Sequence, residues 1–190
     1  GVAPMPGKFR EAKYSLCRVY FNPEDCSFGT TVDTLYNAVA DGRSVSFPRI
    51  SPDGRFLVYA LSDYGNFSIW HKESDLYCID LTTGETTCMD ALNSDDVESY
   101  HSWSSNSRWL VFSTRRDDGL YTKPYFSYID ADGNAHKPFL LPQRNPRHYY
   151  DSKMFAYNIP EFVSAKVTLT GSEIASFARK GKARKLTFRK

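Results

Sequence analysis

The hydrophobic pattern of the chain contains two kinds of strand-like segment. RFLVYA (55–60) and RWLVFS (108–113) are apolar at consecutive positions, whereas FVSAKVTLT (162–170) alternates apolar and polar residues. A short continuous apolar run is typical of a strand covered on both faces, and alternation is typical of a strand with one exposed face. The pattern therefore predicts buried strands in the middle of the chain and a further strand near its C-terminus.

The two buried segments belong to a longer repeat. SFPRISPDGRFLVYA (46–60) aligns without gaps on SYHSWSSNSRWLVFS (99–113). The identical pairs are Ser46/Ser99, Ser51/Ser104, Arg55/Arg108, Leu57/Leu110 and Val58/Val111. In the first copy Pro presets φ, Asp bonds its own backbone and Gly accepts positive φ, so Ser-Pro-Asp-Gly predicts a tight turn between two strands. The second copy has Ser in place of Pro and Gly, and we expect its turn to be less rigid.

Each copy continues with a similar second half. DLYCIDLTTGE (75–85) parallels FSYIDADGN (126–134), and both carry an Ile-Asp strand followed by a Gly turn. Upstream, YSLCRVYFNPEDCSFG (14–29) reads as the strand, turn and strand of another unit that lacks its first half. In the first full unit we expect strands at 47–50, 55–60, 76–81 and 86–90. Four antiparallel strands recurring about every 50 residues are typical of β-propeller blades.

The predicted fold is therefore all-β, with β-propeller-type four-stranded antiparallel blades, two complete and one partial. The expected divisions are 1–45, the end of a preceding blade and its connection; 46–98, blade one; 99–142, blade two; and 143–190, a C-terminal connection, closing strand and basic tail. Because propellers usually have about four to eight blades, we expect the chain to be a fragment or C-terminal part of a larger propeller. Otherwise the tail or a second copy must cover its open edges.

Composition agrees with a strand-rich chain and restricts the partners. Tyr, Phe and Trp are abundant, with 13, 13 and 3 residues, and aromatic side chains favour strands. The net charge of +2 does not indicate nucleic-acid binding, although basic residues crowd the tail at 178–190. No stretch of about 18 apolar residues is present to span a bilayer. After the strand at 162–170, we expect a short helix with Ser172 as its cap.

The four cysteines, at positions 17, 26, 78 and 88, do not have the spacing of a zinc site. Cys78 and Cys88 flank the predicted turn LTTGE, and a hairpin there would bring them close together. A cross-strand disulfide and two free thiols both remain open for this pair.

No sequence motif indicates catalysis. The chain lacks G-x-S-x-G, H-E-x-x-H and a Gly-rich phosphate loop, and its four histidines are scattered, so we predict neither catalytic residues nor a metal or other cofactor. The acidic run before His101 lacks the spacing of an EF-hand and is interpreted as a capped turn. Arg49 and His101 fall on equivalent first strands, one register apart, and would border a channel if both blades belong to one ring. The loop STRRDDGLY (113–121) supplies further candidates for a binding rim. The candidate binding residues are Arg49, His101, Arg115, Arg116, Asp117 and Asp118.

The unit FPRISPDGRFLVY (47–59) resembles the TolB-type, WD40-like propeller repeat (the PD40 type), whose hallmark is the Ser-Pro-Asp-Gly turn. Segments from about Tyr14 to Phe162 are similar to the TolB-like envelope proteins common in Bacteroidetes. Ser105 and Ser107 depart from the hallmark in the second copy.

The resemblance implies a non-catalytic scaffold or protein-binding module in the periplasm or cell envelope, with a protein partner there. Self-association that covers open blade edges is a further expectation. The alternative is that the chain is the propeller portion of an enzyme. That enzyme would be either a serine peptidase gated by its propeller or a metal-dependent lyase acting on polysaccharides. Fold by itself does not decide between these functions.

Overall fold

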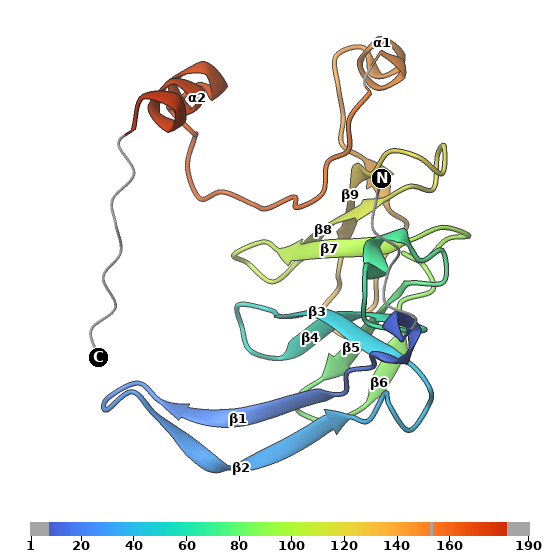
Figure 1. Ribbon diagram of the computed structural model, residues 1–190, viewed down its shortest axis with the longest axis vertical. Coiled ribbons are helices and arrows are strands. Elements are labelled where there is room, and N and C mark those ends of the chain that lie inside the picture. The colour runs from blue at the N-terminus through green and yellow to red at the C-terminus, as the bar shows by residue number, and fades with distance from the viewer. Residues whose placement is uncertain (1–7, 153, 182–190) are drawn as a thin grey trace.

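The computed structural model describes residues 8–152 and 154–181. A two-stranded hairpin, a first four-stranded sheet and a second four-stranded sheet follow one another along the chain and are stacked in that order (Figure 1). Two short α-helices follow the second sheet. No helix within the described ranges is long and apolar enough to cross a membrane.

The hairpin follows a short 3-10 helix, η1 (Phe9–Glu11), and consists of β1 (Leu16–Asn22) and β2 (Ser27–Tyr36). Its base packs against the first sheet, where the rings of Tyr36 and Tyr59 lie 5.8 Å apart. A cluster of buried side chains joins the two layers there. The rest of the hairpin extends away from the sheets (Figure 1).

Blade one consists of β3 (Ser44–Ile50), β4 (Phe56–Ser62), β5 (Asp75–Asp80) and β6 (Thr86–Cys88), paired antiparallel in chain order. A second 3-10 helix, η2 (Ser68–Trp70), lies in the loop between β4 and β5. All seven residues of β4 are buried, as the continuous apolar run predicts.

Blade two has the same order. It consists of β7 (Glu98–Trp103), β8 (Trp109–Thr114), β9 (Lys123–Tyr128) and the short β10 (Phe139–Leu140). Two consecutive four-stranded antiparallel sheets packed on one another are the architecture of propeller blades, so the predicted fold class is confirmed. A closed ring is not formed by the described residues.

The two repeat turns have the same hydrogen bonds, although their sequences differ. In blade one the Ser51 hydroxyl donates to the Asp53 carboxylate at 2.6 Å and accepts from the Phe56 amide at 2.9 Å. In blade two Ser104 makes the equivalent bonds to Asn106 and Trp109, at 2.6 and 2.9 Å. These hydrogen bonds do not distinguish the two turns, so the expectation that the second turn is less rigid stays a prediction.

Ser107 compensates for the missing glycine of the second turn. It adopts φ 58° where Gly54 adopts φ 77°. Its buried hydroxyl accepts a 3.0 Å hydrogen bond from the backbone amide of Asp53, in the turn of the other blade. Serine at this position therefore ties the two turns together, which glycine could not do.

Gly54→Ala is expected to lower the free energy of unfolding by about 1 kcal/mol, because an L residue with a Cβ is strained in the left-handed conformation. No atom lies within 4 Å of the position that the added methyl would occupy, so the loss reflects backbone strain and not a clash. Gly171→Ala is the matched control, since Gly171 also has open space but begins α2 without a positive φ. Urea unfolding should show a lower free energy of unfolding for Gly54→Ala and not for Gly171→Ala. An equal loss of stability in both variants would contradict the assignment of the effect to backbone strain at Gly54.

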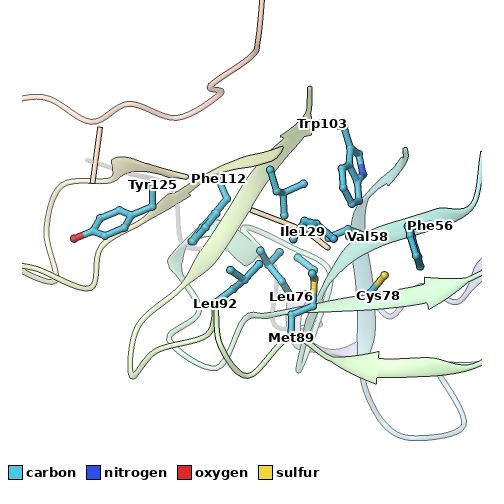
Figure 2. Close-up of a cluster of buried hydrophobic side chains, with 12 residues drawn as sticks. Phe56, Val58, Leu76, Cys78, Met89, Leu92, Trp103, Phe112, Tyr125 and Ile129 are labelled. Carbon is cyan, nitrogen blue, oxygen red and sulfur yellow. The ribbon is translucent and has the colours of Figure 1, made fainter. Parts of the chain in front are cut away.

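The main core lies between the two blades (Figure 2). Side chains from β4 and β5 meet side chains from β8 and β9, and Phe112 and Leu76 are fully buried there. The Trp103 indole at the end of β7 donates a 3.2 Å hydrogen bond to the carbonyl of Arg49 on β3. Blade one and blade two therefore share one hydrophobic core.

The C-terminal part differs from two sequence-based expectations. Residues 162–170 form no strand, because none of the strands in residues 8–152 and 154–181 lies alongside them to pair with. Helix α1 (Pro146–Asp151) precedes this segment and α2 (Gly171–Lys180) follows it. The cap of α2 is Thr170 and not Ser172, since Thr170 and Glu173 form a reciprocal capping box. Residues 182–190 of the predicted basic tail lie outside the described residues.

Candidate binding site at the first strands

The first strands of both blades carry the same irregularity. Pairing of β3 with β4 shifts between Ser46 and Arg49, and pairing of β7 with β8 shifts between Ser99 and Ser102. At each shift an aromatic residue adopts a positive φ, 55° at Phe47 and 44° at Tyr100. Such residues cost roughly 1–3 kcal/mol each and are concentrated at functional sites. The repeat therefore builds the same strained bulge twice, side by side.

The two bulges meet at a small pocket. The rings of Phe47 and Tyr100 lie 4.6 Å apart, centroid to centroid. The pocket has a volume of about 150 Å³ and is closed on one side by the segment 159–161. Its remaining lining comes from the two bulged strands: Phe47, Pro48, Arg49, Tyr100, His101 and Ser102. We call this region the first-strand site.

His101 is the buried polar group of the first-strand site. Its Nε2–H donates a 2.8 Å hydrogen bond to the carbonyl of Val58 on the neighbouring blade. That bond places the proton on Nε2, so Nδ1 carries a lone pair, and Nδ1 has no hydrogen-bond partner within the described residues. Desolvation by burial lowers the pKa of His101 to about 4, and the nearby Arg49 charge adds to the effect. His101 is therefore neutral near pH 7.

The charged groups of the first-strand site are of opposite sign. Arg49 is exposed, and its guanidinium makes no hydrogen bond or ion pair within the described ranges. Glu161, on the segment that closes the pocket, is exposed and also forms no ion pair there. An unpaired guanidinium and a carboxylate beside aromatic rings can recognise both the charges and the apolar groups of a ligand.

His101 is not suited to act as a general base near pH 7. A general base acting near pH 7 needs a pKa close to that pH, whereas His101 has a pKa of about 4 and its Nε2–H is already engaged by Val58. No group of three or more His, Cys, Asp or Glu side chains is placed to hold a metal ion in the part of the chain that the structure describes. Of the sequence-predicted candidates, two line this pocket together: Arg49 and His101.

The other four candidates have internal partners. Arg115 forms a buried ion pair with Asp96 at 3.2 Å, and its guanidinium lies over the ring of Trp70, 5.0 Å from the centroid. A further hydrogen bond of 3.3 Å joins Arg115 to the carbonyl of Trp70 in the β4–β5 loop. Arg115 therefore connects the divergent loops of the two blades.

Arg116 pairs with Glu98, the first residue of β7, at 2.9 Å. The Glu98 side chain is fully buried and also accepts hydrogen bonds from the hydroxyls of Ser94 at 2.6 Å and Thr114 at 2.9 Å. Burial raises the pKa of Glu98, while these donors and the Arg116 charge oppose the rise. The ion pair is embedded at one end of blade two.

Asp117 and Asp118 share Lys123 as an ionic partner, at 3.3 and 3.1 Å. Asp117 also accepts a 2.7 Å hydrogen bond from the Tyr125 hydroxyl. The backbone amides of Leu120 and Tyr121 both donate to Asp118 at 2.9 Å. These contacts give the loop 115–121 a structural role, and its role in binding stays a prediction.

Sequence reasoning missed Phe47, Tyr100 and Glu161 as members of the site. The aromatic character of Phe47 and Tyr100 at matching repeat positions was visible, but a positive φ at either one has no sequence signature. Glu161 reaches the pocket because the chain after α1 returns across blade two, where the Tyr157 amide donates to the carbonyl of Thr122 at 2.9 Å. Only the three-dimensional structure shows that return.

The cysteines are free thiols in the structure. In the β5–β6 pairing, Cys78 is opposite Thr87 and Cys88 is opposite Tyr77, so the two cysteines lie on opposite faces of the blade. The proposed Cys78–Cys88 disulfide is therefore not formed, because the register places the two side chains apart.

A thiol reagent at pH 8 is expected to modify the exposed Cys17 and Cys26 first and the partly buried Cys88 more slowly. Burial raises the pKa of Cys78 to about 12, so this thiol should react only as fast as the blade opens. After unfolding without reductant, all four thiols should be titrated. A total of two would show that a disulfide exists after all.

Comparisons with known proteins give only weak likenesses to this chain. No protein-family model matches it, and no curated protein matches it. The β-propeller domain of the trilobed protease from Pyrococcus furiosus, described with an open velcro topology, is 21% identical with a TM-score of 0.40; the match covers 70% of this chain and 36% of that one. A structure from a study of two prolyl endopeptidases is 13% identical with a TM-score of 0.31, covering 70% and 30% of the two chains. The chain thus spans about a third of the length of these solved structures.

Proposed function

We propose that the chain is a non-catalytic, β-propeller-type binding module that takes up a segment of a protein partner at the first-strand site. The observation that carries the proposal is the unpaired Arg49 guanidinium beside the Phe47 and Tyr100 rings, which are tilted by 37° to each other, with the neutral His101 lining the same pocket. Aromatic residues and arginine are the groups that contribute most to protein–protein binding. The expected partner segment carries an acidic residue for Arg49 and an apolar residue for the rings.

The test is selection from a random peptide library against the immobilised 190-residue chain. Enriched peptides should contain an acidic residue next to an apolar one, and Arg49→Glu should weaken their binding at least about tenfold through charge reversal. Arg18→Glu is the matched control: Arg18 is also exposed, but it lies on the hairpin and pairs with Asp33 at 3.3 Å. No enrichment, or equal binding by the Arg49 and Arg18 variants, would contradict the proposal.

The proposed location is the periplasm or cell envelope. This rests on the resemblance of the repeat to TolB-like envelope proteins. The full-length open reading frame tests it, because an envelope protein should begin with a signal or lipoprotein sequence.

Our second proposal is that the chain is the propeller portion of an enzyme. That portion would be either the gating propeller of a serine peptidase or the propeller of a metal-dependent polysaccharide lyase. The same open reading frame distinguishes it from a stand-alone module. A hydrolase domain beyond these blades would support the peptidase, and metal bound to the purified full-length protein would support the lyase. If both are absent, the enzymatic proposal fails.

A further inference from the structure

Two groups of opposite charge line the first-strand site without pairing with each other. The Arg49 guanidinium and the Glu161 carboxylate are both exposed, and neither has an ionic partner among the described residues. Arg49 comes from β3, whereas Glu161 belongs to the segment that closes the pocket. A free guanidinium binds an acidic group, and a free carboxylate binds a cation. The site is therefore suited to a ligand that carries both charges.

His101 adds an uncharged acceptor to the same lining. The carbonyl of Val58 accepts its Nε2–H, and Nδ1 has no hydrogen-bond partner within the described ranges. His101 is only 2% exposed. A buried acceptor without a donor is unfavourable, so a ligand N–H that reaches Nδ1 gains a hydrogen bond there. Because the ring is neutral near pH 7, it does not repel a cation bound by Glu161.

The size of the pocket limits which group can enter it. Its volume is about 150 Å³, and one water molecule takes about 30 Å³ of the liquid, so the pocket holds roughly five non-hydrogen atoms. The alkyl stem of a lysine side chain would fill this space and leave no room for an acidic group. The α-ammonium group of a chain is attached directly to its first Cα, and an acidic side chain can follow at once. An N-terminus therefore fits the pocket better than a lysine side chain.

We propose that the segment bound at the first-strand site is the N-terminus of the partner chain, whose α-ammonium group pairs with Glu161 and donates to Nδ1 of His101. Arg49 then pairs with an acidic group among the first residues of the partner, and an apolar side chain packs on Phe47 and Tyr100. This N-terminus is the partner segment of the proposed function, on which the inference rests. Capture of an N-terminal amine is a recurring mode of peptide recognition.

The first test uses a synthetic pool of amidated hexapeptides, randomised at the first three positions and made in two forms. One form has free N-termini. In the other form the N-termini are acetylated, which removes the positive charge and enlarges the group. Each pool is passed over the immobilised 190-residue chain, and the captured peptides are quantified by mass spectrometry. Peptides with free N-termini should be captured at least about tenfold more strongly than the same sequences with acetylated N-termini.

The second test removes the charge that is assigned to the ammonium group. Glu161→Gln nearly keeps the size of the side chain, and the preference for free N-termini should then largely disappear. The enrichment of an acidic residue should remain, because Arg49 is unchanged. Glu24→Gln is the matched control and should keep the full preference. Glu24 is also exposed and forms no ion pair within the described residues, but it lies in the turn between β1 and β2.

The possible failures can be told apart. If neither pool is captured, the proposed function is overturned together with its N-terminal form. If both pools are captured equally, or if the preference survives in Glu161→Gln, only the N-terminal assignment is overturned. The partner would then bind through internal residues or through a lysine side chain. A preference that is lost equally in Glu24→Gln would also overturn the assignment to Glu161.

Discussion

Glu98→Ala is expected to lower the free energy of unfolding by about 3–5 kcal/mol, because it leaves the Arg116 cation in a largely buried position without its counter-ion. The Glu98 side chain is 0% exposed and that of Arg116 is 17% exposed. The substitution also removes the acceptor for the Ser94 and Thr114 hydroxyls. Equilibrium unfolding in urea, followed by tryptophan fluorescence, measures the loss.

The control for Glu98 is an ion pair of similar length at the surface. Arg18 and Asp33 lie 3.3 Å apart on the hairpin, and their side chains are 58% and 57% exposed. Asp33→Ala should change the free energy of unfolding by less than about 1 kcal/mol, because water screens the pair. If the two variants lose equal stability, the buried network around Glu98 does not have the assigned structural role.

The second large effect is a pH dependence that originates at His101. Its pKa is about 4 in the folded protein, against an ordinary value of 6.5, because the buried ring resists protonation. Between these two pH values the unfolded chain binds more protons than the folded one, so the free energy of unfolding falls as the pH is lowered through this window. Below about pH 4 the loss levels off, since both states are then protonated. The loss should reach about 3 kcal/mol at pH 4, at 1.36 kcal/mol per pKa unit.

His101→Gln isolates this contribution. Its amide can still donate to the carbonyl of Val58, but it does not titrate. Urea unfolding at pH 8, 6, 5 and 4 should therefore give a steeper loss for the wild type than for the variant. Parallel pH profiles of the two proteins would mean that His101 is protonated as easily in the folded state as in the unfolded chain.

The sequence predicted the blades because their determinants are local and repeated. The consecutive apolar residues of β4 and β8 predict strands covered on both faces, and the Ser51–Gly54 turn is fixed by contacts within a few residues. Such signals can be read without knowing the fold. The same holds for the helix that begins at Gly171, although the sequence pattern places its cap at Ser172 and the structure places it at Thr170.

The site is harder to predict from the sequence than the blades, because its determinants are distant in sequence or lie in the backbone conformation. The sequence shows Arg115 as a charged residue of a loop, but its partners Asp96 and Trp70 come from other segments. The positive φ at Phe47 and Tyr100 leaves no mark in the pattern of residue types. Residues 162–170 have the alternation of a strand, yet strand formation requires a neighbouring strand, and none lies beside them among the described residues.

The two blades meet around a buried, neutral His101 at the first-strand site. The most direct measurement is a pH titration of the nitrogen-15 and carbon-bound proton resonances of the His101 ring by NMR. We expect a neutral ring at pH 7 with its proton on Nε2, and a pKa near 4. A proton on Nδ1, or a pKa near the ordinary 6.5, would contradict it.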